Sequence, residues 1–196
     1  MATRGLYGFR KNGEDKLTYN HCNSGPEHLG AYIAEFAMET SVEELNAIYD
    51  KLILIDRSST PTLAQIEECQ WWASLNVSTR EMNNWICLLW LAQGDFTALK
   101  SNLRYMVDYQ GFIKDSLFCE YAYIINLDDN VLEFWMGFQQ EPQEGNRYGT
   151  EDIAGFYPCK LALVFPLGYF SGSVTSQMMD HVAHVGEFIP PVRQSQ

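Results

Sequence analysis

The chain has 196 residues, of which 46% are hydrophobic and 14% aromatic, a composition that favours a folded domain over a disordered chain. Its 25 acidic and 13 basic residues give a formal net charge of −12 at pH 7. Because Lys and Arg contacts to phosphate dominate nucleic-acid binding, this charge argues against direct nucleic-acid binding and against docking on anionic lipid. It is compatible with solubility alone, with a basic protein partner, or with mimicry of nucleic-acid charge.

The cysteines are odd in number, scattered and without a CxxC pair, which favours free, mostly buried thiols in a reducing compartment. They are Cys22, Cys69, Cys87, Cys119 and Cys159. No apolar run approaches the ~18 residues of a membrane span, and the first residues lack the apolar core of a secretion signal. We therefore expect a cytoplasmic protein with no membrane partner.

The first predicted element is a hairpin of two strands over residues 5–10 and 16–21. Asn12-Gly13 between them is a strong signal for a tight turn. Alternation along the second strand places Leu17, Tyr19 and His21 on one face. We therefore expect His21 to extend the apolar face inward and Cys22 to point the other way.

Helical patterns follow through the middle of the chain. Pro26 suits a first helical position, and Ser41 with Glu44 forms a capping box before the next helix. The other predicted helices run from Thr60 to about Ser74, from the capping box at residues 78–81 to Gly94, and from Asp95 to about Leu103. Trp85 is assigned to the core, whereas Trp90 and one of Trp71 and Trp72 are candidates for exposure at an interface.

The last third returns to the period of strands. Alternation predicts a strand over residues 119–127, a turn at Asp128-Asp129-Asn130, and a return strand over 131–138. A polar loop, a strand over 160–165 and a helix over 173–185 follow. This order favours an α+β fold, with an antiparallel sheet from N-terminal and C-terminal strands and a central group of helices. We predict one domain over residues 1–186 and a loose tail over 187–196.

Polar side chains concentrate where the first hairpin ends and the first helix starts, the arrangement that a binding site requires. The candidate ligand-binding residues are Thr3, Arg4, His21, Asn23, Glu27 and His28. The first hairpin is also the most basic part of the chain, through Arg4, Arg10, Lys11 and Lys16. Ser24-Gly25 leads into a helix N-terminus, which favours anions, so a small anionic ligand is one hypothesis.

An enzymatic alternative uses Cys22 as a thiolate nucleophile with His21 or His28 as its base, in a small hydrolase or transferase. Its weakness is that His21 and Cys22 point to opposite faces of an extended strand. A metal site from His181 and His184 is a further alternative, but it falls short of the four ligands of a closed zinc site. The phosphate-binding motifs GxxxxGK[ST] and GxGxxG are absent from the sequence. We therefore assign no cofactor and no metal.

The N-terminal block resembles a family of uncharacterised bacterial and phage proteins. The resemblance is carried by Ala2-Thr3-Arg4, Tyr19-Asn20-His21 and the Pro-x-x-x-Gly run of residues 26–30. Weaker matches continue at residues 85–89, 93–95, 121–128 and 157–158. Other members follow the histidine with Trp-Asp-Gly-Tyr-Pro, whereas this chain has the amide of Asn23 in place of the carboxylate.

The resemblance implies a phage or mobile-element setting and, because an amide cannot act as a base, a binder rather than a catalyst. Our preferred hypothesis is a phage-encoded, non-enzymatic binding protein in the host cell cytoplasm. It would inhibit or sequester a host protein, such as an antiviral-defence protein, or a nucleotide signal. The sequence leaves homo-oligomerisation open.

Overall fold

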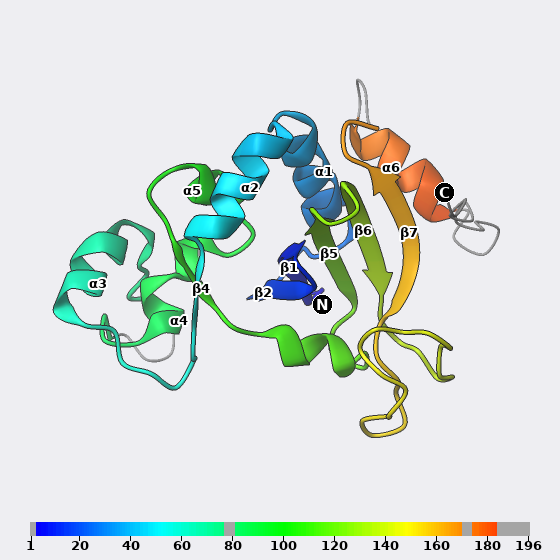
Figure 1. The fold of residues 1–196 in the computed structure, drawn as a ribbon. Helices are drawn as coiled ribbons and strands as arrows, with labels where there is room; N and C mark the ends of the chain where they lie inside the picture. The colour runs from blue at the N-terminus through cyan, green and yellow to red at the C-terminus, as the bar shows by residue number, and fades with distance from the viewer. Residues whose placement is uncertain (1–2, 77–80, 170–173, 184–196) are drawn as a thin grey trace.

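The computed structural model of the protein describes residues 3–76, 81–169 and 174–183 (Figure 1). The strands are β1 (Gly5–Lys11), β2 (Glu14–Asn20), β3 (Ile53–Ile55), β4 (Tyr105–Val107), β5 (Tyr121–Asn126), β6 (Val131–Met136) and β7 (Lys160–Pro166). The α-helices are α1 (Ala31–Met38), α2 (Val42–Lys51), α3 (Leu63–Cys69), α4 (Trp85–Leu88), α5 (Phe96–Lys100) and α6 (Val174–Ala183). Short helices of other types are the π-helix η1 (Pro26–Gly30) and the 3₁₀ helices η2 (Gln70–Trp72), η3 (Trp90–Ala92) and η4 (Gln110–Lys114). The predicted tail, 187–196, lies outside the described residues.

The main sheet has five strands in the order β2-β1-β5-β6-β7, so the α+β prediction is confirmed. The expectation of an antiparallel sheet is wrong at one pairing, because β1 runs parallel to β5. The other neighbours in this sheet are antiparallel. Parallel neighbours need a long crossover. Here residues 21–120 supply it and bring the chain back to the end of the sheet where β1 begins.

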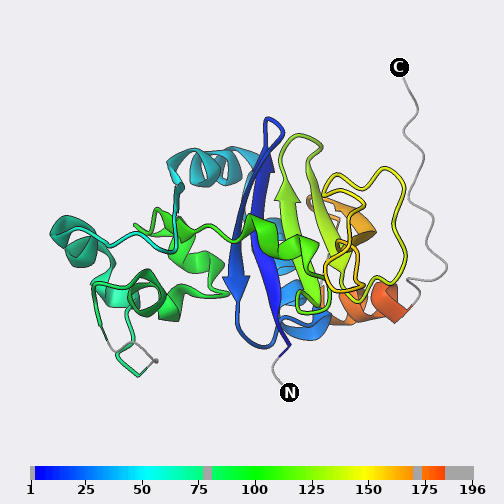
Figure 2. The ribbon, with the colours of Figure 1, turned by 90° about the horizontal axis from the view of Figure 1, so that it is seen from below.

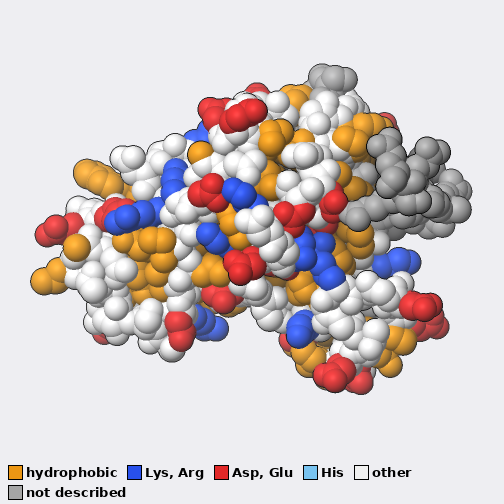
Figure 3. Space-filling view, viewed as in Figure 1, with side chains coloured by type: hydrophobic (Ala, Val, Ile, Leu, Met, Phe, Trp, Pro, Cys, Tyr) orange, Lys and Arg blue, Asp and Glu red, His pale blue; other side chains and the backbone are white. Residues whose placement is uncertain are grey.

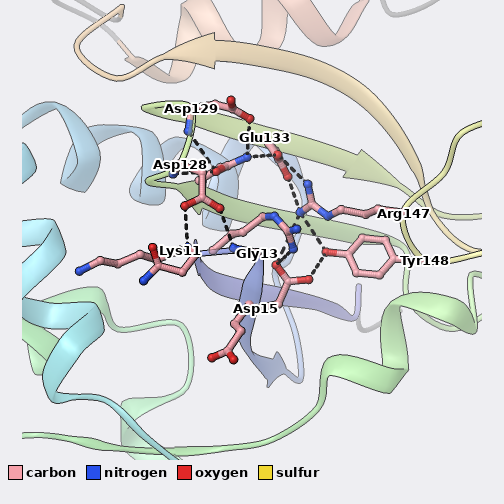
Figure 4. A network of polar contacts seen from close by, with 12 residues as sticks. Lys11, Gly13, Asp15, Asp128, Asp129, Glu133, Arg147 and Tyr148 are labelled. Carbon is pink, nitrogen blue, oxygen red and sulfur yellow. Dashed lines mark hydrogen bonds and ion pairs between the residues drawn. The ribbon is translucent and has the colours of Figure 1, made fainter.

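The two hairpin turns of the sheet are confirmed and are tied to each other. Asn12 and Gly13 have φ angles of 54° and 77°, the left-handed backbone that the Asn-Gly pair predicted. Asp128, in the turn between β5 and β6, accepts hydrogen bonds from the backbone amides of Asn12 at 2.6 Å and Gly13 at 2.9 Å (Figure 4). These bonds, led by that from Gly13, lower the pKa of the Asp128 carboxyl.

Helices cover one face of the sheet, with α1 and α6 lying over β5, β6 and β7 (Figure 1). The main core lies in this layer, where Tyr7 and Phe9 of β1 pack their rings against Phe96 of α5. The predicted capping box is present, because Ser41 accepts from the amide of Glu44 while the Glu44 carboxylate accepts from the amide of Ser41. The helix N-terminus therefore starts where the sequence placed it.

The other face of the sheet is covered by η4, which crosses it on the side away from α1 (Figure 2). A second, smaller core lies there, with Leu6, Leu17, Ile113 and Trp135 all at most 2% exposed. The segment is held by the amide of Tyr109, which donates to the carbonyl of Leu17 at 3.0 Å. This fixes residues 109–112 beside the end of β2.

The helix predicted from residue 78 to Gly94 is wrong as a continuous element, and its predicted capping residue, Ser78, lies outside the described residues. The α-helical part begins only at Trp85, because the side chain of Asn84 accepts from the amides of Ile86 at 2.9 Å and Cys87 at 3.4 Å. Asn favours such caps over helix interiors because its side chain competes for backbone groups. The predicted helices after Thr60 and Asp95 are also shorter, ending at Cys69 and Lys100.

A second sheet, absent from our predictions, consists of the parallel three-residue strands β3 and β4. It joins the main sheet to the part of the chain that carries α3 and α4 (Figure 1). Arg57 follows β3 after one residue, and Tyr109 follows β4 after one residue. The short sheet therefore places these two side chains at the same side of the molecule.

A buried polar network fixes the long connection between β6 and β7 (Figure 4). Glu133 of β6 is 3% exposed and receives both guanidinium nitrogens of Arg147, at 2.7 and 2.6 Å. Asn126 and Trp135 donate to the same carboxylate at 2.7 and 2.9 Å. The hydroxyl of Tyr148 donates to Asp15 of β2 at 2.9 Å. No buried side-chain nitrogen or oxygen of the described residues lacks a hydrogen-bond partner, so these contacts can hold the connection in place.

The surface view in Figure 3 shows Lys and Arg side chains scattered among Asp and Glu. They form no broad basic tract on this face among the residues that the structure describes. Hydrophobic side chains gather over the part of the surface that carries α3, α4 and β4. In the described parts of the chain, no helix combines the length and apolar character needed to cross a membrane.

Candidate functional site

A groove of about 680 Å³ lies between the end of β2, the α4–η3 region and η4. We call it the aromatic groove. It is lined by Arg4, Tyr19, His21, Arg57, Asn76, Ile86, Trp90, Gln93, Tyr109, Phe112 and Phe118. Its volume falls within the range of about 300–1,000 Å³ typical of small-molecule sites. The lining comes from segments that are far apart in the sequence and that the two sheets bring together.

The wall of the groove is a connected set of rings. Tyr19 has its ring centroid 5.3 Å from that of Tyr109 and 5.4 Å from that of Phe112. The ring of His21 lies 6.0 Å from Tyr19 and 5.8 Å from Trp90. All five side chains are half-buried or exposed, so parts of their rings face solvent. Such rings can hold a flat ligand by stacking.

Two arginines border this wall. The guanidinium of Arg4 lies 5.6 Å from the ring centroid of Phe118, and that of Arg57 lies 5.7 Å from that of Tyr109. These ring contacts keep both cations at the groove.

Neither of these two guanidinium groups has a carboxylate partner among the described residues. The other described arginines are all paired, Arg10 with Asp15, Arg104 with Glu68 and Arg147 with Glu133. The carboxylate of Glu120 accepts from the backbone amide of Arg4 at 3.1 Å, and Asp56 and Asp108 share a neighbouring pocket with Arg57, but neither guanidinium is engaged by them in an ion pair. Two such cations at one groove suit an anion, which arginine binds with a planar set of N–H donors.

The tyrosines of the groove are neutral donors. Burial raises the pKa of Tyr19, while Arg4 opposes the rise; burial likewise raises the pKa of Tyr109, and Arg57 opposes it. The hydroxyl of Tyr19 is hydrogen-bonded to Nδ1 of His21 at 3.1 Å. The groove therefore offers ring faces, two cations and neutral polar groups.

A small inner cavity of about 40 Å³ adjoins the groove. The two share Tyr19, Ile86, Gln93 and Tyr109 in their linings. The cavity is large enough for a water molecule, which needs about 10–15 Å³. Most of the cavity lining is apolar, and Gln93 is one of its few polar side chains.

The structure places two of the six predicted site residues in the aromatic groove and the other four outside it. Arg4 and His21 line the aromatic groove, whereas Thr3, Asn23, Glu27 and His28 do not. His21 lies beyond the end of β2 and is exposed, so the expectation that it points inward is wrong, although it stays beside Tyr19. The carbonyl of Thr3 accepts from the amide of Ser24 at 3.2 Å, a contact that closes the loop.

The loop between β2 and η1 is held by side chains that our predictions did not single out. Asn20 is 6% exposed and its Nδ2 donates to the carbonyl of Cys22 at 2.6 Å and to the Ser24 hydroxyl at 2.8 Å. Tyr123 of β5 donates to the carbonyl of Ser24 at 3.0 Å. Much of the polar character of the N-terminal block therefore serves to fix this loop.

The helix start after Ser24-Gly25 faces a carboxylate of the chain itself. A Cβ atom built on Gly25 would lie 2.8 Å from both carboxylate oxygens of Glu27. An anion at this helix start would meet that carboxylate at close range. This carboxylate disfavours an anion at the helix start, and Arg4 lines the aromatic groove instead.

The basic residues of the first hairpin are engaged in structural contacts. Arg10 pairs with Asp15 at 2.9 Å, and Lys11 pairs with Asp50 at 2.7 Å. The ammonium of Lys16 donates to two carbonyls near the C-terminus of α2, those of Tyr49 at 2.9 Å and Leu52 at 2.7 Å. Of these four basic residues, only Arg4 lines the aromatic groove.

The histidines nearest to Cys22 have other partners in the described structure. His21 is bonded to Tyr19, and Nε2 of His28 lies 3.9 Å from a carboxylate oxygen of Glu27. Cys22 is exposed and does not line the groove. The described residues include no group of three or more potential His, Cys, Asp or Glu metal ligands. His184 and the side chain of His181 lie outside the description.

Sequence reasoning missed most of the groove. Arg57 and Tyr109 follow strands of three residues, which are too short for a clear alternation signal. Trp90 was expected to be a candidate for exposure and is half-buried in the groove, whereas Trp71 is 79% exposed. The prediction that Trp85 belongs to the core is confirmed by its exposure of 1%.

Comparisons with known proteins assign the chain to no family. No protein-family model matches the chain, and neither a curated protein nor a solved structure gives a match. The groove is therefore interpreted from its own chemistry.

Proposed function

We propose that this chain is a non-enzymatic binding protein whose aromatic groove takes a small anionic ligand with a flat ring, of the nucleotide class. The observation that carries the proposal is the pair Arg4 and Arg57, both without a carboxylate partner among the described residues and both bordering a wall of rings. A phosphate supplies the missing anion, and a base supplies a π-face for stacking.

The composition of the lining favours binding over group transfer. Among the described residues, the groove is lined by no carboxylate, thiol or aliphatic hydroxyl. Its titratable groups are the two arginines, the tyrosines and His21. Among the described lining residues, a hydroxyl lies beside a base where Tyr19 is bonded to His21, and burial raises the pKa of that phenol, which disfavours its ionised form. The alternative that uses Cys22 gains no support from geometry, since Cys22 lies outside the groove.

The biological form of the proposal is that the protein sequesters a nucleotide signal of a host cell, in line with the resemblance of its N-terminal block to phage proteins. A single ligand in a groove also agrees with the acidic surface. Repulsion by the net charge of −12 disfavours long polyanions, whereas two local arginines can hold one small anion.

Isothermal titration calorimetry of the purified chain against mononucleotides and cyclic dinucleotides tests the proposal. Substitution of Arg4 or Arg57 by Gln is expected to weaken binding about tenfold or more, as for the loss of a charged hydrogen bond. Arg104→Gln is the matched control, because Arg104 is exposed and pairs with Glu68 outside the groove. The proposal fails if no nucleotide binds, or if all three variants bind as the wild-type protein does.

A further inference from the structure

Gln93 occupies a special place in the aromatic groove, because it also lines the inner cavity. It is half-buried, and its side-chain amide has no hydrogen-bond partner among the described residues. A Gln side chain offers both a carbonyl acceptor and N–H donors. An amide at the junction of two cavities therefore presents both kinds of group to a ligand.

The backbone on either side of Gln93 is clamped by one buried hydroxyl. Tyr7 is 3% exposed and donates to the carbonyl of Ala92 at 3.0 Å, while its oxygen accepts from the amide of Gly94 at 2.9 Å. The amide of Gln93 donates to the carbonyl of Trp90 at 3.3 Å. A recognition group held on fixed backbone loses little freedom on binding, which favours specific contacts.

Position 94 requires glycine for the same arrangement. Its φ is +73°, and a Cβ atom there would lie 2.9 Å from the side-chain oxygen of Asn20. Asn20 itself holds the loop after β2, which carries His21. The ring wall and the backbone of Gln93 are therefore parts of one rigid unit.

We propose that Gln93 is the base-reading residue of the groove and selects adenine. This inference rests on the proposed function. The amide of Gln pairs in a bidentate manner with the adjacent N6 donor and N7 acceptor of adenine, whereas guanine presents two acceptors at the corresponding edge. Arg4 and Arg57 hold the phosphate while the base lies against the rings of Tyr19 and Tyr109.

Titration of the full chain with AMP, GMP, CMP and UMP tests this reading, because the four ligands share one phosphate and differ in the base. AMP is expected to bind about tenfold or more tightly than GMP, within the discrimination of a bidentate contact. Gln93→Leu is expected to bring the four affinities within about twofold to threefold of one another, because the discriminating contact is lost. Gln110→Leu is the matched control and should keep the preference, since Gln110 lies outside the groove.

A second variant guards against loss of structure in Gln93→Leu. Gln93→Met keeps the approximate length of the side chain but removes both its donor and its acceptor, so the preference for AMP over GMP should be lost while the circular dichroism spectrum stays unchanged. If all four nucleotides bind equally to the wild-type protein and Arg4→Gln weakens them all, the proposed function stands and the reading by Gln93 is wrong. Retention of the AMP preference in both Gln93 variants also overturns it.

Discussion

Replacement of Arg147 by Met removes the cation that neutralises a buried carboxylate. Both guanidinium nitrogens reach Glu133, at 2.7 and 2.6 Å, and the Glu133 side chain is 4% exposed. Removing one partner of a buried ion pair costs about 3–5 kcal/mol, because the remaining charge is left without compensation. Asn126 and Trp135 still donate to Glu133 in the variant, so we expect a loss at the lower end, about 3 kcal/mol.

Urea unfolding at pH 7 measures this loss, with Arg104→Met as the control. Arg104 also forms a two-nitrogen contact, with Glu68, but the side chains are 49% and 28% exposed. An exposed pair contributes about 0–1 kcal/mol, so the two variants should differ by about 2 kcal/mol or more. Adding Glu133→Gln to Arg147→Met should recover part of the loss, because no buried charge then remains. Equal losses for Arg147→Met and Arg104→Met would refute the reasoning from burial.

Two further predictions concern buried hydroxyl and thiol groups. Tyr7→Phe should lower the free energy of unfolding by about 2 kcal/mol in urea titrations, because it leaves the buried carbonyl of Ala92 without its donor and the part-buried amide of Gly94 without its acceptor; a change below about 0.5 kcal/mol would contradict the clamp at Gln93. Burial raises the pKa of the Cys69 thiol to about 12, so the folded state keeps a proton that the unfolded state loses above its ordinary value of 9.0. Stability should therefore fall by about 1.4 kcal/mol per pH unit from this group as pH rises from 9 toward 12. The slope should be shallower in Cys69→Ala, and parallel slopes in the two proteins would contradict this assignment.

Local signals in the sequence predicted the elements whose ends are set by their own residues. Asn12, Gly13 and Asn130 adopt the left-handed backbone that tight hairpins require, and Ser41 with Glu44 caps its helix as expected. The direction in which β1 meets β5 depends on how the chain crosses between them, which no local pattern encodes. The helix before Gly94 was overestimated because apolar spacing outweighed the capping tendency of Asn84.

The sequence allowed us to predict only the groove residues that come from the N-terminal block. Arg4 and His21 were found because they lie in a short block that is rich in polar residues. Arg57, Gln93 and Tyr109 come from separate segments, and they meet only because β3 pairs with β4 and η4 lies beside β2. The absence of a carboxylate partner for Arg4 and Arg57 is a property of the folded chain, and composition suggested the opposite because acids are in excess.

The central claim is that Arg4 and Arg57 together hold the anionic part of a nucleotide in the aromatic groove. Calorimetric titration of AMP into the Arg4→Gln/Arg57→Gln double variant, alongside wild-type protein and Arg104→Gln, tests it most directly. We predict saturable binding to the wild-type protein and to Arg104→Gln, and a loss of about 100-fold or more in the double variant. Wild-type affinity in the double variant, or no binding of AMP or any other nucleotide to the wild-type chain, would contradict it.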